Sequence, residues 1–171
     1  MNSWIFWSKK ATNAIDGVGL LALRLWVAQE FILAGLTKLS GDWLAPDWFK
    51  ALTFPPLIRL LPADLNWIMA GLGEIGLGLA LALGLMSRFA SLGLLFITYV
   101  AVYSVHFDLG WAGWNQIETE QGLGFKIPLM LAIMLMTIFS QGAGRHSIDA
   151  VLLGFFQQKS KQGLNDHSTR H

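Results

Sequence analysis

Glu74 is the one ionisable residue in the apolar run from Leu65 to Met86, which is long enough to cross a bilayer. An ionised side chain at bilayer depth costs at least about 2.5–3.5 kcal/mol, so such a group usually faces protein and pairs with another group. Gly71, Glu74 and Gly78 share one helix face, so a neighbouring helix can approach the acid closely. Glu74 is therefore the first candidate catalytic residue. The alternative is a satisfied hydrogen bond between helices.

The preceding apolar run, residues 17–39, also carries charge: Arg24, Glu30 and Lys38 interrupt it. At about 1.5 Å of rise per residue, Glu30 and Glu74 reach similar depths. We expect Arg24 to join Glu30 or Glu74 in one network, or the two carboxylates to share a proton. The network would neutralise the interior, whereas the shared proton would suit proton transfer coupled to a quinone or a transported solute. Glu30 is thus a second catalytic candidate, and Arg24 and Lys38 are candidate substrate-binding residues.

The run from Phe89 to Phe107 adds a polar stripe, because Tyr99, Tyr103 and His106 recur at i, i+4 and i+7. Tyr103 and His106 are further candidate substrate-binding residues that could donate to a quinone carbonyl. Aromatic anchoring at the membrane interface is the alternative for the tyrosines. The other histidines lie on the opposite membrane side in this topology, so a haem held by two histidines is not expected.

Composition places the chain among small membrane proteins. Of its 171 residues, 54% are hydrophobic and 13% charged, with a mean hydropathy of +0.50. A net charge of +1 without a basic aromatic patch argues against nucleic acid as a partner. The absence of cysteine removes iron–sulfur clusters and cysteine zinc sites, and no metal site is expected.

The pattern predicts an all-α, integral membrane four-helix bundle with interfacial amphipathic segments. Its expected spans are residues 17–39, 65–86, 88–107 and 123–140. Around this 17–140 bundle we expect an interfacial segment at 1–16, an amphipathic surface helix at 141–158 and a flexible tail at 159–171.

The orientation of the chain in the membrane follows from its basic residues, which concentrate in the two terminal segments and in the tight turn after the second span. Arg88 lies in this turn and is expected to be a structural charge. The positive-inside rule then puts both termini in the cytoplasm and the two tryptophan-rich loops outside. The expected location is the bacterial inner membrane.

The same residues resemble the DoxX family of small four-span membrane proteins. The resemblance covers roughly residues 20–153 and rests on the order of Leu23-Arg24-Leu25, Phe31, Gly35, Lys38-Leu39, Glu74, Gly84-Leu85, Arg88, Gly142-Ala143-Gly144 and Ser147-Ile148-Asp149. Ala143 stands where the family usually has proline. Relatives include a subunit associated with archaeal terminal quinol oxidase and thiosulfate:quinone oxidoreductase, and a membrane component of an actinobacterial oxidative-stress complex with superoxide dismutase and a sulfurtransferase.

The resemblance implies a subunit in quinone-linked redox or oxidative-stress metabolism, with quinone as the expected cofactor and a buried charged pocket as its site. The alternative is a non-enzymatic docking or assembly partner for a peripheral enzyme or maturation system. A small proton-coupled transporter ranks lower, because four spans leave little room for alternating access. Expected partners are membrane lipid and a peripheral or integral protein, and a homo-oligomer stays open.

Overall fold

The computed structural model describes residues 17–152. The expected segments 1–16 and 159–171, and the end of the expected surface helix 141–158, lie outside these residues. The four long helices are α2 (Val18–Leu39), α4 (Ala63–Leu83), α5 (Ser87–Val105) and α6 (Lys126–Gln141). Shorter elements occupy the connections: α3 (Asp47–Lys50), η1 (Ile58–Leu60), η2 (Gly110–Asn115), β1 (Glu118–Thr119) and β2 (Gly122–Leu123).

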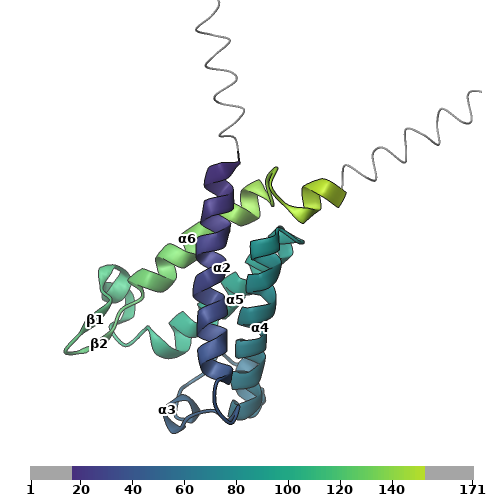
Figure 1. Cartoon of the computed structure of the whole chain (residues 1–171). Helices are drawn as coiled ribbons and strands as arrows, with labels where there is room; N and C mark the ends of the chain where they lie inside the picture. The colour runs from purple at the N-terminus through teal and green to yellow at the C-terminus, as the bar shows by residue number, and fades with distance from the viewer. Residues whose placement is uncertain (1–16, 153–171) are drawn as a thin grey trace, which may run out of the picture.

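The predicted all-α four-helix bundle is confirmed. Helix α2 packs mainly on α4, α6 packs on α5, and the contact between α4 and α5 joins the two pairs (Figure 1). A core of fully buried apolar side chains lies between them, formed by Val27, Leu81, Leu94, Leu135 and Ile138. Helices α2, α4 and α5 are long and apolar enough to cross a membrane, whereas α6 is a shorter apolar helix.

The last helix begins later than the predicted span 123–140, because the residues before it form a hairpin. Strands β1 and β2 pair antiparallel, with Thr119 opposite Gly122. The N–H of Leu123 donates to the Asp108 carboxylate at 3.1 Å, which holds this residue in the hairpin. Helix α6 therefore starts at Lys126, with Pro128 in its first turn, where proline costs no helical hydrogen bond.

The tight turn between α4 and α5 is fastened by the C-terminal part of the chain. Gly84 ends α4 in the left-handed conformation, at φ 69°, while the N–H of Leu85 donates to the Ala80 carbonyl at 2.8 Å. The Asp149 carboxylate accepts hydrogen bonds from the N–H groups of Met86 and Ser87, at 2.9 and 3.3 Å. We call this end of the bundle, residues 84–87 with 143–149, the turn end.

At the opposite end, the connection between α2 and α4 folds back on the helices rather than projecting as a domain. Ala45, Phe49 and Phe54 are buried with Trp67 of α4 in a second apolar cluster. The N–H of Ala45 donates to the Asp64 carboxylate at 2.9 Å, which fixes the start of this segment. We call residues 45–61 with the start of α4 the loop end (Figure 1).

Substituting Gly84→Ala should destabilise the turn end. The left-handed conformation costs an L-residue about 1–2 kcal/mol, and the new Cβ would lie 2.5 Å from Cβ of Ser147. Reversible unfolding in mixed detergent micelles measures the loss. The control is Gly76→Ala in the same helix, where a Cβ meets nothing within 4 Å; it should be neutral or stabilise by about 0.5–1 kcal/mol. Equal stabilities of the two variants would contradict this account of the turn.

Candidate functional site

Lys38 and Glu74 form an ion pair between α2 and α4. Nζ of Lys38 donates to both carboxylate oxygens, at 2.9 Å to Oε1 and 2.8 Å to Oε2. The Glu74 side chain is 8% exposed and the Lys38 side chain 23%. Charge-assisted hydrogen bonds to both oxygens are among the stronger polar contacts in proteins. The pair therefore supplies the charge compensation that the acid in the middle of α4 requires.

Glycines bring the two helices close enough for this pair to form. A Cβ on Gly35 would lie 2.6 Å from the Gly71 carbonyl oxygen and 3.1 Å from Cβ of Glu74. A Cβ on Gly78 would lie 2.8 Å from Cγ1 of Ile32. The predicted face of Gly71, Glu74 and Gly78 is therefore the surface on which α2 packs, as small residues at helix contacts allow.

Trp67 holds Lys38 in place from the loop end. Its indole Nε1 donates to the Lys38 carbonyl at 2.9 Å, and Nζ of Lys38 lies 5.8 Å from the centroid of the Trp67 ring. The Trp67 ring in turn packs edge-on against Phe49, with 4.8 Å between ring centroids. The buried part of the loop end thus sets the position of the ammonium group.

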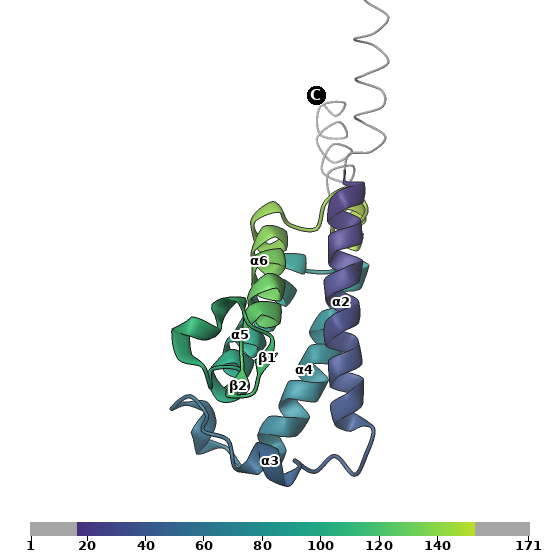
Figure 2. The same cartoon turned by 90° about the vertical axis from the view of Figure 1, so that its left-hand side faces the viewer.

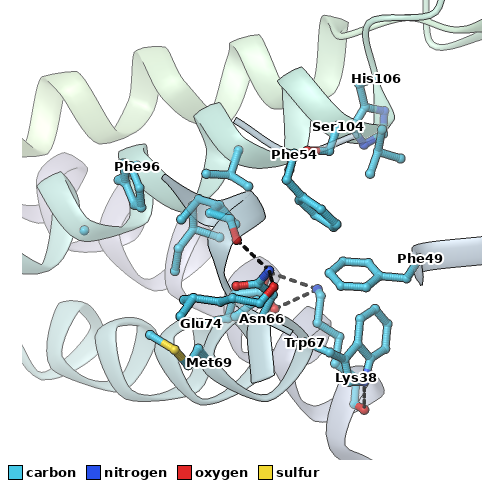
Figure 3. A pocket seen from close by; sticks show the side chains of 18 of the residues that line it. Lys38, Phe49, Phe54, Asn66, Trp67, Met69, Glu74, Phe96, Ser104 and His106 are labelled. Atoms are coloured by element: carbon cyan, nitrogen blue, oxygen red, sulfur yellow. Dashed lines mark hydrogen bonds and ion pairs between the residues drawn. The ribbon is translucent and has the colours of Figure 1, made fainter. Parts of the chain in front are cut away.

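A cavity of about 470 Å³ opens beside the ion pair, between α4, α5 and the loop end (Figure 3). Its walls are mainly apolar and aromatic, and include Phe49, Phe54, Met69, Phe96 and Val100. Its polar lining residues are Lys38, Asn66, Glu74, Ser104 and His106. A mostly apolar cavity of this size with a few placed polar groups is typical of small-molecule sites.

Two polar atoms of the cavity wall have no partner. Oγ of Ser104 and Nδ1 of His106 are buried and make no hydrogen bond to the residues that the structure describes. Figure 3 shows both side chains on α5 and just beyond its end, across the cavity from Met69. A buried polar group left unpaired costs about 1–3 kcal/mol. These two atoms therefore mark where a ligand's hydrogen-bonding group would be stabilised.

His106 follows the last residue of α5, and its half-buried position affects its protonation. Burial lowers the pKa of the His106 imidazole, while the Gly124 backbone and the Asp108 carboxylate raise it by smaller amounts. Desolvation disfavours the charged form, so the neutral imidazole is the stabilised state. Because the other ring nitrogen of His106 donates its N–H to the Gly124 backbone, Nδ1 of the neutral imidazole is a hydrogen-bond acceptor at the cavity wall.

The cavity brings together three of the six predicted catalytic and substrate-binding residues: Lys38, Glu74 and His106. Glu30, Arg24 and Tyr103 do not line it. Glu30 is exposed on α2. Tyr103 is 45% exposed, beside the similarly exposed Tyr99, with 6.3 Å between the ring centroids. This position matches the alternative of aromatic anchoring.

Arg24 does not form the predicted network with Glu30 or Glu74. Its side chain is buried at the turn end and donates to four backbone carbonyls: Leu81 at 3.2 Å, Ala82 at 3.2 Å, His146 at 3.1 Å, and Ala143. The last carbonyls of a helix have no partner within the helix, so the end of α4 offers acceptors to a guanidinium. These four acceptors hold the Arg24 guanidinium at the turn end, away from Glu30 and Glu74.

Arg88, the predicted structural charge, also contacts a helix end. Its Nη2 donates to the Ser140 carbonyl near the end of α6, at 3.5 Å. Its Nε would lie 3.3 Å from a Cβ on Gly142, so the side chain packs against that glycine.

The sequence interpretation missed the polar lining residues Asn66 and Ser104, and it missed the aromatic residues of the wall, Trp67 among them. Asn66 and Trp67 stand in the first turns of α4, and Ser104 stands near the end of α5. Because α4 and α5 are joined by a tight turn, the start of α4 and the end of α5 lie at the same membrane depth. This pairing could have indicated from the sequence that Asn66, Trp67 and Ser104 lie close together. Within residues 17–152, no three His, Asp or Glu side chains lie together as a metal site would require.

The comparisons with known proteins agree on a family. The model of the DoxX family matches residues 19–107. A protein of Haemophilus influenzae, described as uncharacterized, is 36% identical over 147 residues, which cover 85% of this chain and 90% of that protein. The chain belongs to the DoxX family. No solved structure matches the chain.

Several of the residues that carry the DoxX resemblance form two groups in space. Arg24, Gly84 and the segment Ala143–Asp149 contact one another at the turn end. Gly35, Lys38 and Glu74 meet at the cavity. One group therefore holds the DoxX bundle together, and the other forms the candidate site.

Removing one member of the ion pair should cost more stability than removing both. Breaking a buried pair costs about 3–5 kcal/mol, and we expect Glu74→Gln to fall at the lower end because Lys38 is partly exposed. Lys38→Met combined with Glu74→Met should be close to neutral, since no unpaired charge is left. Unfolding in detergent measures both, with exposed Glu120→Gln as the control. If the double variant loses as much unfolding free energy as the two single substitutions together, the two side chains are not coupled.

The stability of the wild-type protein should fall as the pH drops below about 6.5, the usual pKa of histidine. The lowered pKa of His106 means that the unfolded chain takes up this proton at a higher pH than the folded chain, so acid favours unfolding. His106→Gln should flatten this part of the melting temperature profile, whereas substitution of the exposed His146 by Gln should not. An unchanged profile in His106→Gln would contradict the assignment.

Proposed function

We propose that this chain is a bacterial inner-membrane protein, with both termini in the cytoplasm, that binds a quinone in the cavity at the loop end. In this proposal it is one subunit of a quinone-linked redox or oxidative-stress system. The observation that carries the proposal is a charged pair, Lys38 with Glu74, set into the wall of an otherwise apolar, aromatic cavity within membrane-spanning helices.

The chemistry of the wall suits a quinone. The ring of a quinone is flat and apolar, and its two carbonyl oxygens accept hydrogen bonds. Aromatic residues such as Phe49 and Phe54 offer surfaces for the ring. The ammonium of Lys38 is a donor for one carbonyl, and the unpartnered hydroxyl of Ser104 is a donor for the other, whereas Nδ1 of His106 is an acceptor.

Glu74 has a second role in this proposal. Reduction of a quinone to a quinol consumes two electrons and two protons, and a buried carboxylate beside the ring can relay protons to its oxygens. The chain has no cysteine, so in this proposal the electrons come from a partner subunit that carries a redox cofactor. This agrees with a role as one subunit rather than as a complete enzyme.

The test is equilibrium binding of decyl-substituted ubiquinone to the purified full chain in lipid nanodiscs. We expect saturable binding that weakens about tenfold or more in Lys38→Met, because a hydrogen bond to a charged group is worth about 1.5–3 kcal/mol. Glu74→Gln should also weaken binding, because it removes the carboxylate that positions the Lys38 ammonium. Glu120→Gln makes the same chemical change at an exposed residue outside the cavity and should bind normally.

Each variant must first elute as a folded, monodisperse species, so that a loss of binding is not a loss of fold. Mass spectrometry of the lipids that copurify with the wild-type protein gives an independent readout. Failure of the folded wild type to bind the quinone, or full binding by Glu74→Gln, would overturn the proposal. Either result would favour the docking or assembly role.

A further inference from the structure

Helix α2 has a polar side chain pair on the side that faces away from the bundle. Gln29 and Glu30 are both exposed, and neither makes a hydrogen bond or ion pair to the residues that the structure describes. Figure 2 shows α2 along one edge of the bundle, with the other labelled helices all on the same side of it. We define the outer face of α2 by six exposed residues of this helix: Ala22, Trp26, Gln29, Glu30, Leu33 and Leu36.

These two polar residues lie near the middle of the membrane. At 1.5 Å per residue, Glu30 is about 18 Å from Val18 and about 14 Å from Leu39, the two ends of α2. A carboxyl group at this depth is expensive against lipid and is nearly always found facing protein. The other two charged residues of α2, Arg24 and Lys38, have partners inside the bundle. Glu30 has none there.

We propose that the outer face of α2 is the interface of a homodimer, in which Glu30 of one copy pairs with Gln29 of a second copy of this chain. Two copies inserted with the same topology are related by a twofold axis along the membrane normal, so each residue lies at the depth of its own counterpart. Gln29 carries amide donors and Glu30 carries acceptors at adjacent positions, so the polar pair is complementary to itself.

The spacing of the outer face fits a pair of parallel helices. Ala22, Trp26, Gln29, Leu33 and Leu36 follow one another at alternating intervals of four and three residues, as along the seam of a coiled coil. Trp26, Leu33 and Leu36 are 58%, 53% and 51% exposed, so they are free to pack across the seam. Glu30 is the next residue after the seam position Gln29, within reach of the facing helix.

Cysteine cross-linking in native membranes tests the dimer, because the chain has no cysteine of its own. Leu33→Cys or Trp26→Cys, at the seam, should form disulfide-linked dimers on oxidation with copper phenanthroline. The matched control is Leu92→Cys on α5, which replaces another leucine that is 53% exposed. We expect several-fold more cross-linked dimer for at least one seam position than for the control, since a disulfide needs closely approaching backbones.

The polar pair is tested in the Leu33→Cys and Trp26→Cys backgrounds. Gln29→Leu combined with Glu30→Leu should lower the dimer yield several-fold, whereas Glu30→Gln, which keeps hydrogen-bonding groups, should retain it. Both side chains are exposed, so the fold should survive. Seam yields no higher than the Leu92→Cys yield, or a yield that the double leucine variant leaves unchanged, would overturn the proposal. Neither result bears on quinone binding.

Discussion

A charged group within a hydrocarbon layer has to be compensated by protein, and this constraint organises the bundle. Helix α2 carries three charged residues, and each meets the constraint differently. Arg24 donates to four backbone carbonyls, and Lys38 pairs with the acid of α4. Glu30 lies exposed on the face away from the bundle. The first two contacts position α2 against α4. The exposed Glu30 is the residue for which we propose a partner in a second copy of the chain.

The contacts of Arg24 and Lys38 lie toward opposite ends of the bundle, one closely packed and the other next to the cavity. Arg24 and Lys38 are separated by fourteen residues, which is about 21 Å along a helix. At the turn end, glycines and the Asp149 carboxylate leave little room between backbones. At the loop end, α4 and α5 leave a cavity that residues of the α2–α4 connection partly cover. A firmly held scaffold beside an open pocket is a common arrangement for a ligand site.

Much of the fold was predictable because long apolar runs in a chain of this size have few uses other than membrane helices. Glu74 was identified as a site residue because it is the sole charge in its run, and a lone buried acid needs a partner. The partner of Arg24 was not predictable, since backbone carbonyls at a helix end have no side-chain signature. The start of α6 depended on a side chain far back in the sequence, Asp108. The cavity itself depends on how residues 45–61 fold back, which no periodic pattern encodes.

The partners of Arg24 also bear on biosynthesis. The carbonyls of Ala143 and His146 lie 119 and 122 residues further along the chain. During translation from the N-terminus, α2 can enter the membrane long before these acceptors have left the ribosome. Until then, the Arg24 guanidinium must be solvated by water, lipid headgroups or the insertion machinery. The bundle therefore reaches its final form only after residues 143–146 have left the ribosome and bound the Arg24 side chain.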